Sequence, residues 1–175
     1  MDCVIVDIET TGLDPVRDRI IEISALKVKN FEIVDEFSTL VNPEMLIPLI
    51  SIKLTGIDNS MVRHMPTIDK VIKHFTEFLG EDVFIAHNAN FDYSFLANAA
   101  FRNNLKLNNR RLCTLKMARK LMPNLNSYKL SSLCNALEII NARPHRARED
   151  AIAAYEIWKK LINNSDIKTI EVLLQ

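Results

Sequence analysis

A short apolar segment that carries two carboxylates constrains this chain more than any other feature. Residues 3–9 have the sequence CVIVDIE, and TTG follows at 10–12. A run rich in Val and Ile is typical of a strand buried on both faces. The side chains of Asp7 and Glu9, two residues apart, then lie on the same face. Neighbouring buried carboxylates repel each other, and a hard cation such as Mg²⁺ or Mn²⁺ would relieve this cost. The alternative is that the strand enters solvent at Asp7 and both acids are hydrated.

Composition excludes several classes of protein. The chain has 175 residues, the length of one domain, and 22 basic residues balance 22 acidic ones. A formal net charge of zero argues against a protein that coats nucleic acid through bulk electrostatics, but not against one that grips a short strand end. Only three glycines are present, at positions 12, 56 and 80, so the G-x-G-x-x-G fingerprint and the Walker loop are both absent.

The cysteines and the apolar runs predict a cytoplasmic protein with no membrane partner. Cys3, Cys113 and Cys134 are odd in number, widely spaced and set among apolar residues, which predicts reduced core thiols and no zinc site. No apolar stretch reaches membrane-spanning length. The chain opens on a strand, so we expect no signal peptide.

Hydrophobic periodicity predicts a mixed α/β fold. After the first strand, further strands are predicted at residues 19–29, 31–41, 82–87 and 111–114. Helices are predicted at residues 67–79, 90–101, 115–122, 129–137 and from near 150 to 162, with short helices on both sides of 54–57. An antiparallel meander followed by two parallel strands gives a five-stranded mixed sheet with helices on both sides. We expect one domain over residues 1–164 and a docked helix or a connector over 165–175.

One further acid faces inward on a predicted helix. Asp92 lies in the first helical turn, and Phe95, Leu96, Ala99 and Ala100 follow at the spacing of one helix face. An interaction with the helix dipole would explain why an acid occupies the first turn, but not why it shares the apolar face. Asp92 is therefore predicted to be buried.

A second inward-facing acid follows a histidine. Asp150 continues into Ala154 and Ile157 at helical spacing, and His145 lies five residues before it. A histidine next to a buried acid is a candidate general base. The arginines of residues 143–148 form either a solvated face or a phosphate-attracting group. Because strand ends and helix starts meet in one crevice, four acids should converge and require two divalent cations about 4 Å apart.

Three segments in this order resemble the motifs of the DEDDh 3′–5′ exonuclease family. They are DIETTG at residues 7–12, HNANFD at 87–92, and His145 followed by Asp150. The chain is similar to the proofreading epsilon subunit of bacterial DNA polymerase III and to the exonuclease domain of the Gram-positive replicative polymerase. The likeness runs from Val4 to about Leu161 and includes LTGI at 54–57.

The resemblance implies a ribonuclease H-like fold and a two-metal hydrolase. Such an enzyme removes nucleoside 5′-monophosphates from the 3′ end of single-stranded or frayed DNA, in proofreading or repair. It implies that Asp7, Glu9 and Asp150 hold one Mg²⁺ or Mn²⁺, that Asp7 bridges to a second, and that Asp92 holds the second ion largely through water. His145 is implied to take a proton from the attacking water. The implied partners are a DNA 3′ end and a DNA polymerase subunit.

Eight residues are predicted to contact the substrate: Thr10, Thr11, Gly12, Leu13, Thr55, Ile57, Asn88 and Phe91. The turn at 10–12 would present backbone amides to the terminal nucleotide, and Gly12 would allow close approach. The apolar members would stack on the terminal base, with ordinary packing as the alternative. Asn88 is also expected to be a turn or cap residue. Two other functions remain open, an exoribonuclease and a non-catalytic nucleic-acid-binding module.

Overall fold

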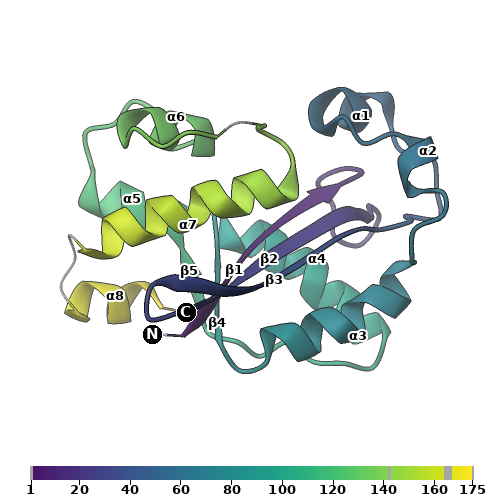
Figure 1. The fold of residues 1–175 in the computed structure, drawn as a ribbon, viewed down its shortest axis with the longest axis horizontal. Helices are drawn as coiled ribbons and strands as arrows, with labels where there is room; N and C mark the ends of the chain where they lie inside the picture. The colour runs from purple at the N-terminus through teal and green to yellow at the C-terminus, as the bar shows by residue number, and fades with distance from the viewer. Residues whose placement is uncertain (1, 142, 164–166, 175) are drawn as a thin grey trace.

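A mixed five-stranded sheet forms the centre of the computed structural model, which describes residues 2–141, 143–163 and 167–174 (Figure 1). The strands are β1 (Cys3–Thr10), β2 (Ile20–Lys29), β3 (Glu32–Leu40), β4 (Val83–Ala86) and β5 (Arg111–Cys113). Their order across the sheet is β3-β2-β1-β4-β5. The pairs β1–β2 and β2–β3 are antiparallel, and the pairs β1–β4 and β4–β5 are parallel. The predicted meander with two added parallel strands is confirmed.

Helices cover both faces of the sheet, as predicted (Figure 1). They are α1 (Leu49–Thr55), α2 (Asn59–Val62), α3 (Ile68–Leu79), α4 (Ala89–Arg102), α5 (Thr114–Leu121), α6 (Leu130–Ala136), α7 (Ala147–Asn163) and α8 (Ile167–Leu173). Helices α3 and α4 pack on one face, and α5, α6 and α7 pack on the other. Two short helices occur in this region, as expected, but α1 extends to Thr55 and thus into residues 54–57, while α2 follows them.

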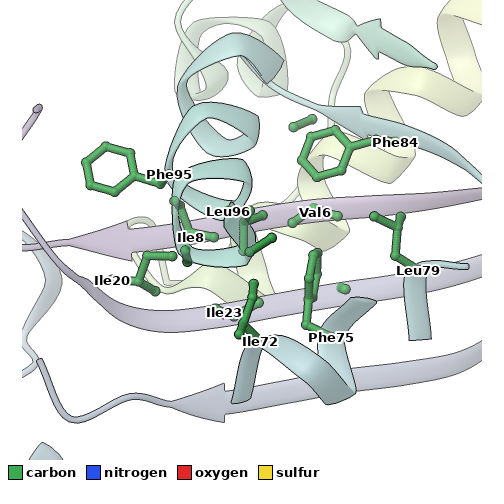
Figure 2. Packing of buried hydrophobic residues seen from close by; sticks show 14 of the residues in the cluster. Val6, Ile8, Ile20, Ile23, Ile72, Phe75, Leu79, Phe84, Phe95 and Leu96 are labelled. Carbon is green, nitrogen blue, oxygen red and sulfur yellow. The ribbon is translucent and has the colours of Figure 1, made fainter. Parts of the chain in front are cut away.

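One face of β1 contributes to the core under α3 and α4. Val6 and Ile8 are buried there against Phe75 of α3 and Leu96 of α4 (Figure 2). These positions alternate with Asp7 and Glu9 along the strand, so the apolar residues leave both acids on the opposite face.

The opposite face of β1 changes character along its length. Cys3 and Ile5 are fully buried against α7, in a cluster that includes Trp158. Asp7 and Glu9 continue the same face toward the carboxyl end of the strand. This change from apolar to acidic side chains places a polar site beside the start of α7.

The three cysteines and the C-terminal helix all contribute to the packed core. All three cysteines are buried and free. No helix in the described ranges has the length and apolar character needed to cross a membrane. Within 165–175, α8 is formed, and Ile170, Leu173 and Leu174 pack against the α7-side core. The predicted division at residue 164 falls outside the described residues and stays a prediction.

Candidate active site

Asp7 and Glu9 lie near the carboxyl end of β1. The antiparallel register sets Asp7 opposite Ser24 and Glu9 opposite Glu22. Directly opposed residues point to the same face, so three carboxylates share this part of the sheet. Glu9 on β1 is only 9% exposed and Glu22 on β2 only 4%, whereas Asp7 is half-buried, so the acids of β1 are not simply hydrated.

Asp92 reaches the same place from α4. Strand β4 ends at Ala86, while its neighbour β1 continues to Thr10. Helix α4 begins just after β4, at Ala89, so its first turn can reach the end of β1. The Ile8 amide donates a hydrogen bond to Asp92 Oδ1 at 3.2 Å. Asp92 is 2% exposed, as its position on the apolar face of the helix predicted.

Asp150 and His145 complete the group from the segment that leads into α7. Oxygen atoms of Glu9 and Asp150 and a ring nitrogen of His145 lie within 4.8 Å of one another. The His145 amide donates to Asp150 Oδ2 at 2.9 Å, and the Asn141 side-chain amide donates to Oδ1 at 2.6 Å. The exposed His145 has a positive φ of 64°, so its backbone turns sharply before the helix begins.

The electrostatics show that ionised carboxylates are unfavourable in this site without cations. Burial raises the pKa of Glu9 to about 8, and repulsion from Asp150 adds to the shift. Burial also raises the pKa of Asp92 to about 8. The pKa of Asp7 is raised well above its usual value, first by burial and then by Asp92 and Asp150. The pKa of Asp150 is also raised, mainly by burial. A buried set of carboxylate oxygens with uncompensated charge fits hard divalent cations.

These shifts predict how stability depends on pH. Without cations, the folded protein keeps protons on Glu9 and Asp92 up to about pH 8, whereas the unfolded chain releases them near its ordinary values of 4.5 and 3.8. The folded state therefore binds more protons across this interval, and thermal stability should decrease as the pH rises through it. Thermal unfolding in chelator from about pH 5 to about pH 9 measures this trend.

Divalent cations should reverse this loss of thermal stability at high pH. Mn²⁺ at about 100 times its Kd adds about 2.7 kcal/mol to the free energy of unfolding. In a domain of this size that is a rise in Tm of about 5–10 °C, largest at high pH where the acids are ionised. A stability that rises with pH in chelator would contradict the assigned burial of these acids.

Glu22 is part of this site, and sequence analysis missed it. The signal was an acid inside the Ile-rich run of residues 20–23, in a strand that is otherwise buried. Asn141 was missed as well, and nothing in the local sequence marks it as a partner of Asp150.

Two of the three arginines near His145 bind carboxylates of the protein, which neither reading of the sequence predicted. Arg146 Nη2 contacts Glu22 Oε1 at 2.7 Å, and Arg148 Nε contacts Glu36 Oε1 at 2.6 Å. Both guanidinium groups thus bind carboxylates of β2 and β3, which attaches the start of α7 to the sheet. Arg143 is exposed, and no ion pair of it is described, as expected for a solvated face.

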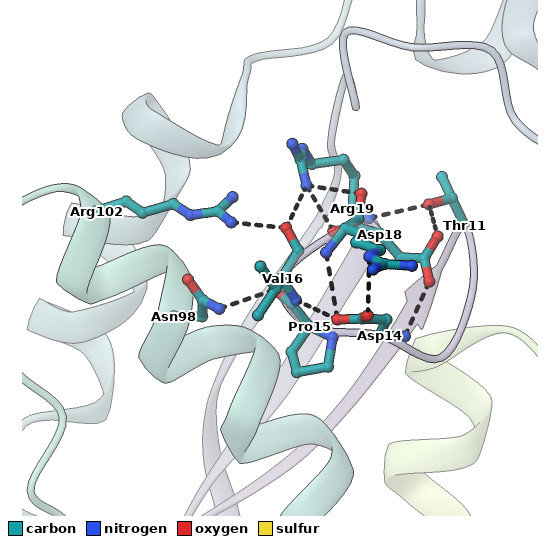
Figure 3. Close-up of polar contacts among 9 residues, drawn as sticks. Thr11, Asp14, Pro15, Val16, Asp18, Arg19, Asn98 and Arg102 are labelled. Carbon is teal, nitrogen blue, oxygen red and sulfur yellow. Dashed lines mark hydrogen bonds and ion pairs between the residues drawn. The ribbon is translucent and has the colours of Figure 1, made fainter.

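The threonine hydroxyls of the predicted substrate turn bind the turn itself. Thr10 Oγ1 donates to the Gly12 carbonyl at 2.6 Å. Thr11 Oγ1 accepts from the Arg19 amide at 2.9 Å and donates to Asp18 Oδ1 at 3.4 Å (Figure 3). A Cβ on Gly12 would lie 2.4 Å from Asp18 Oδ2, so this glycine makes room for a carboxylate of the protein.

The loop that follows the turn is attached to α4. Asn98 Nδ2 donates to the Pro15 carbonyl at 3.0 Å, and Arg102 Nη2 donates to the Val16 carbonyl at 2.7 Å (Figure 3). Because α4 also carries Asp92, these contacts fix the turn at the end of β1 relative to the second acid-bearing element.

Two residues predicted to contact the substrate, Thr55 and Ile57, are buried in the structure. Ile57 is 0% exposed and packs with Ile21 and Val62, so it has no free surface for a base. Thr55 Oγ1 donates to the Ser51 carbonyl and accepts from the Ile57 amide, which makes it an internal group. The neighbouring Gly56 ends α1 with a φ of 71°, and left-handed backbone explains this glycine.

Three residues of the second motif, HNANFD at 87–92, have different environments. Asn88 is exposed and occupies the N-cap position of α4 in a left-handed conformation, without a side-chain cap bond. Phe91 is partly buried and packs against Phe95, with ring centroids 5.0 Å apart. His87 contacts Thr114 Oγ1 and the Tyr128 carbonyl, and burial lowers its pKa to about 4, so it is a neutral structural histidine.

Leu13 and Ile57 give a paired prediction about substrate contact. Leu13 is 84% exposed beside the turn at the end of β1, whereas Ile57 is in the core. Leu13→Ser should raise KM for an oligonucleotide and leave Tm unchanged. Ile57→Ala should lower the free energy of unfolding by about 2–5 kcal/mol because it leaves a cavity. Steady-state kinetics and thermal unfolding distinguish the two effects, and an unchanged KM for Leu13→Ser would remove Leu13 from the substrate site.

A known exonuclease family matches most of this chain. The family model RNase_T, described as an exonuclease, matches residues 4–158. The chain is 47% identical over 159 residues to a "DNA polymerase III PolC-type" of Caldanaerobacter subterraneus, covering 91% of this chain and 11% of that protein. It is 38% identical over 171 residues to the protein of the same name from Bacillus subtilis, covering 96% and 12%. The chain thus spans about a tenth of the length of these relatives.

Solved structures show the same architecture. Exonuclease X in complex with 5′ overhanging duplex DNA is 30% identical, with a TM-score of 0.76 over 93% of this chain and 92% of that chain. Escherichia coli exonuclease I in complex with a dT13 oligonucleotide is 20% identical, with a TM-score of 0.81 over 91% and 40% of the two chains, and this likeness concerns the fold. The expected ribonuclease H-like fold is thereby confirmed.

Proposed function

The chain belongs to the RNase_T exonuclease family, and from that membership we propose that it is a 3′–5′ exonuclease that hydrolyses DNA one nucleotide at a time from the 3′ end. The proposed products are nucleoside 5′-monophosphates. The observation that carries this proposal is the convergence of Glu9, His145 and Asp150 within 4.8 Å, with the buried Asp92 and the half-buried Asp7 close enough to interact with them electrostatically.

The acids are arranged to hold divalent cations, on which the family depends. We assign Asp7, Glu9 and Asp150 to one ion, and Asp7 with Asp92 to a second. Mg²⁺ and Mn²⁺ are the ions that best suit all-oxygen donors of this kind. When bound, such a pair neutralises charge on the phosphoryl oxygens and makes the attacking water more acidic.

His145 has the position of a general base. Its ring is exposed at the rim of the acidic group, so a water can reach it, and its backbone is held by Asp150. An imidazole nitrogen accepts the proton from water as the oxygen attacks phosphorus, and the 3′ oxygen of the preceding nucleotide leaves. The Asp150 carboxylate thus serves the site twice, as a cation ligand and as the acceptor that fixes His145.

A DNA terminus is favoured as substrate by the relatives. The 30% identical exonuclease X was solved with duplex DNA that has a 5′ overhang, which leaves a recessed 3′ end. The curated relatives are DNA polymerases of which this chain matches about a tenth, so a polymerase is the proposed partner and the cytoplasm the proposed location. Proofreading of a frayed primer end would be the corresponding role.

A matched set of oligonucleotides tests the activity. DNA and RNA strands of one sequence, each labelled at the 5′ end, should be compared in Mn²⁺, Mg²⁺ and chelator. We expect DNA to shorten stepwise from the 3′ end, only with a cation. Preferential shortening of RNA would indicate an exoribonuclease, and binding without shortening would indicate a non-catalytic module.

A further inference from the structure

Glu22 is a buried carboxylate to which the proposed chemistry gives no role. It is 4% exposed, lies on β2 opposite Glu9, and adds to the negative potential at both Asp7 and Glu9. A fifth acid in such a site is unfavourable unless it is paired. Its contacts explain why the protein tolerates it.

Both oxygens of Glu22 bind the segment just before and at the start of α7. Oε1 accepts from Arg146 Nη2 at 2.7 Å, and Oε2 accepts from Arg146 Nε at 3.2 Å. Oε2 also accepts from the Ala147 amide at 2.9 Å. Glu22 thus directs both of its oxygens to Arg146 and to the first amide of α7.

The residues held by Glu22 lie between the general base and an acid of the site. His145 immediately precedes Arg146, and the Asp150 amide donates to the Arg146 carbonyl at 3.0 Å. Ala147 is the first residue of α7, and its amide belongs to those that a helix leaves without an internal partner. An acceptor from the central sheet therefore fixes where α7 begins and how it is oriented.

We propose that Glu22 is a positioning residue that holds His145 and Asp150 in place through Arg146 and the first amide of α7. The inference rests on the proposed exonuclease function for its kinetic consequence, but its structural part does not. It adds to the site a residue that touches neither water nor substrate. Its effect should appear in kcat, because a small displacement of a base or ligand costs up to about 100-fold in rate.

The chain offers a matched control. Glu36 on β3 binds Arg148, the second residue of α7, with a similar two-oxygen geometry at 2.6 and 3.0 Å. That pair is more exposed, with 49% and 32% of the two side chains accessible against 31% and 5% for Arg146 and Glu22. Glu22→Gln and Glu36→Gln each remove the charge from a carboxylate–guanidinium pair near the start of α7, one next to the acids and one away from them.

Kinetics of the two variants test the proposal. Glu22→Gln should lower kcat on a DNA oligonucleotide by about 10–100-fold with KM unchanged, whereas Glu36→Gln should match the wild type. Arg146→Met should have the same defect, and the double variant should be no worse than either single one because both act through one contact. Equal kcat for Glu22→Gln and Glu36→Gln, or additive defects in the double variant, would overturn the proposal.

A second measurement keeps the inference separate from the exonuclease assignment. Hydrogen exchange of the amides of residues 146–150 should be faster in Glu22→Gln than in Glu36→Gln, since the Ala147 amide loses a charged acceptor. A wild type inactive on every oligonucleotide would refute the proposed function, and exchange would still decide the role of Glu22. Unchanged exchange would refute the positioning role. If Glu22→Gln fails to fold, the double variant with Arg146→Met removes the unpaired guanidinium and takes its place in both measurements.

Discussion

Replacing Asp7 with Asn is expected to lower kcat by at least about 1,000-fold, or about 4 kcal/mol of transition-state stabilisation. Asp7 is the acid that interacts with Asp92, Asp150 and Glu9 together, so it is the natural bridge between two cations. The amide keeps the shape of the side chain and removes its charge. Exposed Asp35 on β3 provides the control, because Asp35→Asn should leave kcat unchanged.

The same variant should be more stable than the wild type when cations are absent. The pKa of Asp7 is raised by burial and by its acidic neighbours, so an ionised Asp7 destabilises the fold. Asp7→Asn should therefore have a higher Tm than the wild type in chelator at about pH 8, and should gain little from Mn²⁺. An Asp7→Asn enzyme with the kcat of the wild type, or one stabilised by Mn²⁺ as much as the wild type, would contradict the two-metal assignment.

Replacing His145 is the second large effect, with an expected loss in kcat of about 100- to 10,000-fold. The residue that replaces His145 has to adopt its φ of 64°, which most side chains disfavour. Asn tolerates this left-handed conformation, so His145→Asn removes the base with little added strain, and His145→Ala shows the cost of strain by comparison.

Retention of cation binding distinguishes the loss of a base from the loss of the site. His145→Asn should keep the rise in Tm that Mn²⁺ produces, since the carboxylates and the amide that binds Asp150 Oδ2 remain. A variant that also lost this stabilisation would show that His145 acts as a ligand, as its place within 4.8 Å of Glu9 and Asp150 would permit. Near wild-type kcat with intact binding would mean that the base lies elsewhere.

The sheet was predictable because its signals are local. Alternation of Val and Ile with Asp7 and Glu9 defines a strand and the face of each side chain, whatever surrounds it. Helical spacing likewise placed Asp92 and Asp150 on inward faces, and both are buried. The sequence thus indicated which acids would be forced together, because buried charge without a partner is a pattern that short-range periodicity reveals.

The contacts of the turn and the loops were less predictable. Thr11, Thr55 and Ile57 were assigned to substrate, yet their side chains bind or pack within the protein. A threonine in a loop has the same local signal whether its hydroxyl faces a ligand or a neighbouring carbonyl. Burial is the property that separates these cases, and it depends on segments distant in the chain.

What the sequence alone determined is the chemistry of the site: four acids and a histidine on elements whose periodicity turns the acids inward. Only the tertiary structure determined how they are held. The Glu22–Ala147 contact joins residues 125 apart, and the Ile8–Asp92 contact joins residues 84 apart. Both contacts depend on strand register and on how α7 and α4 dock on the sheet. These are properties of many cooperative interactions, which no local pattern of residues encodes.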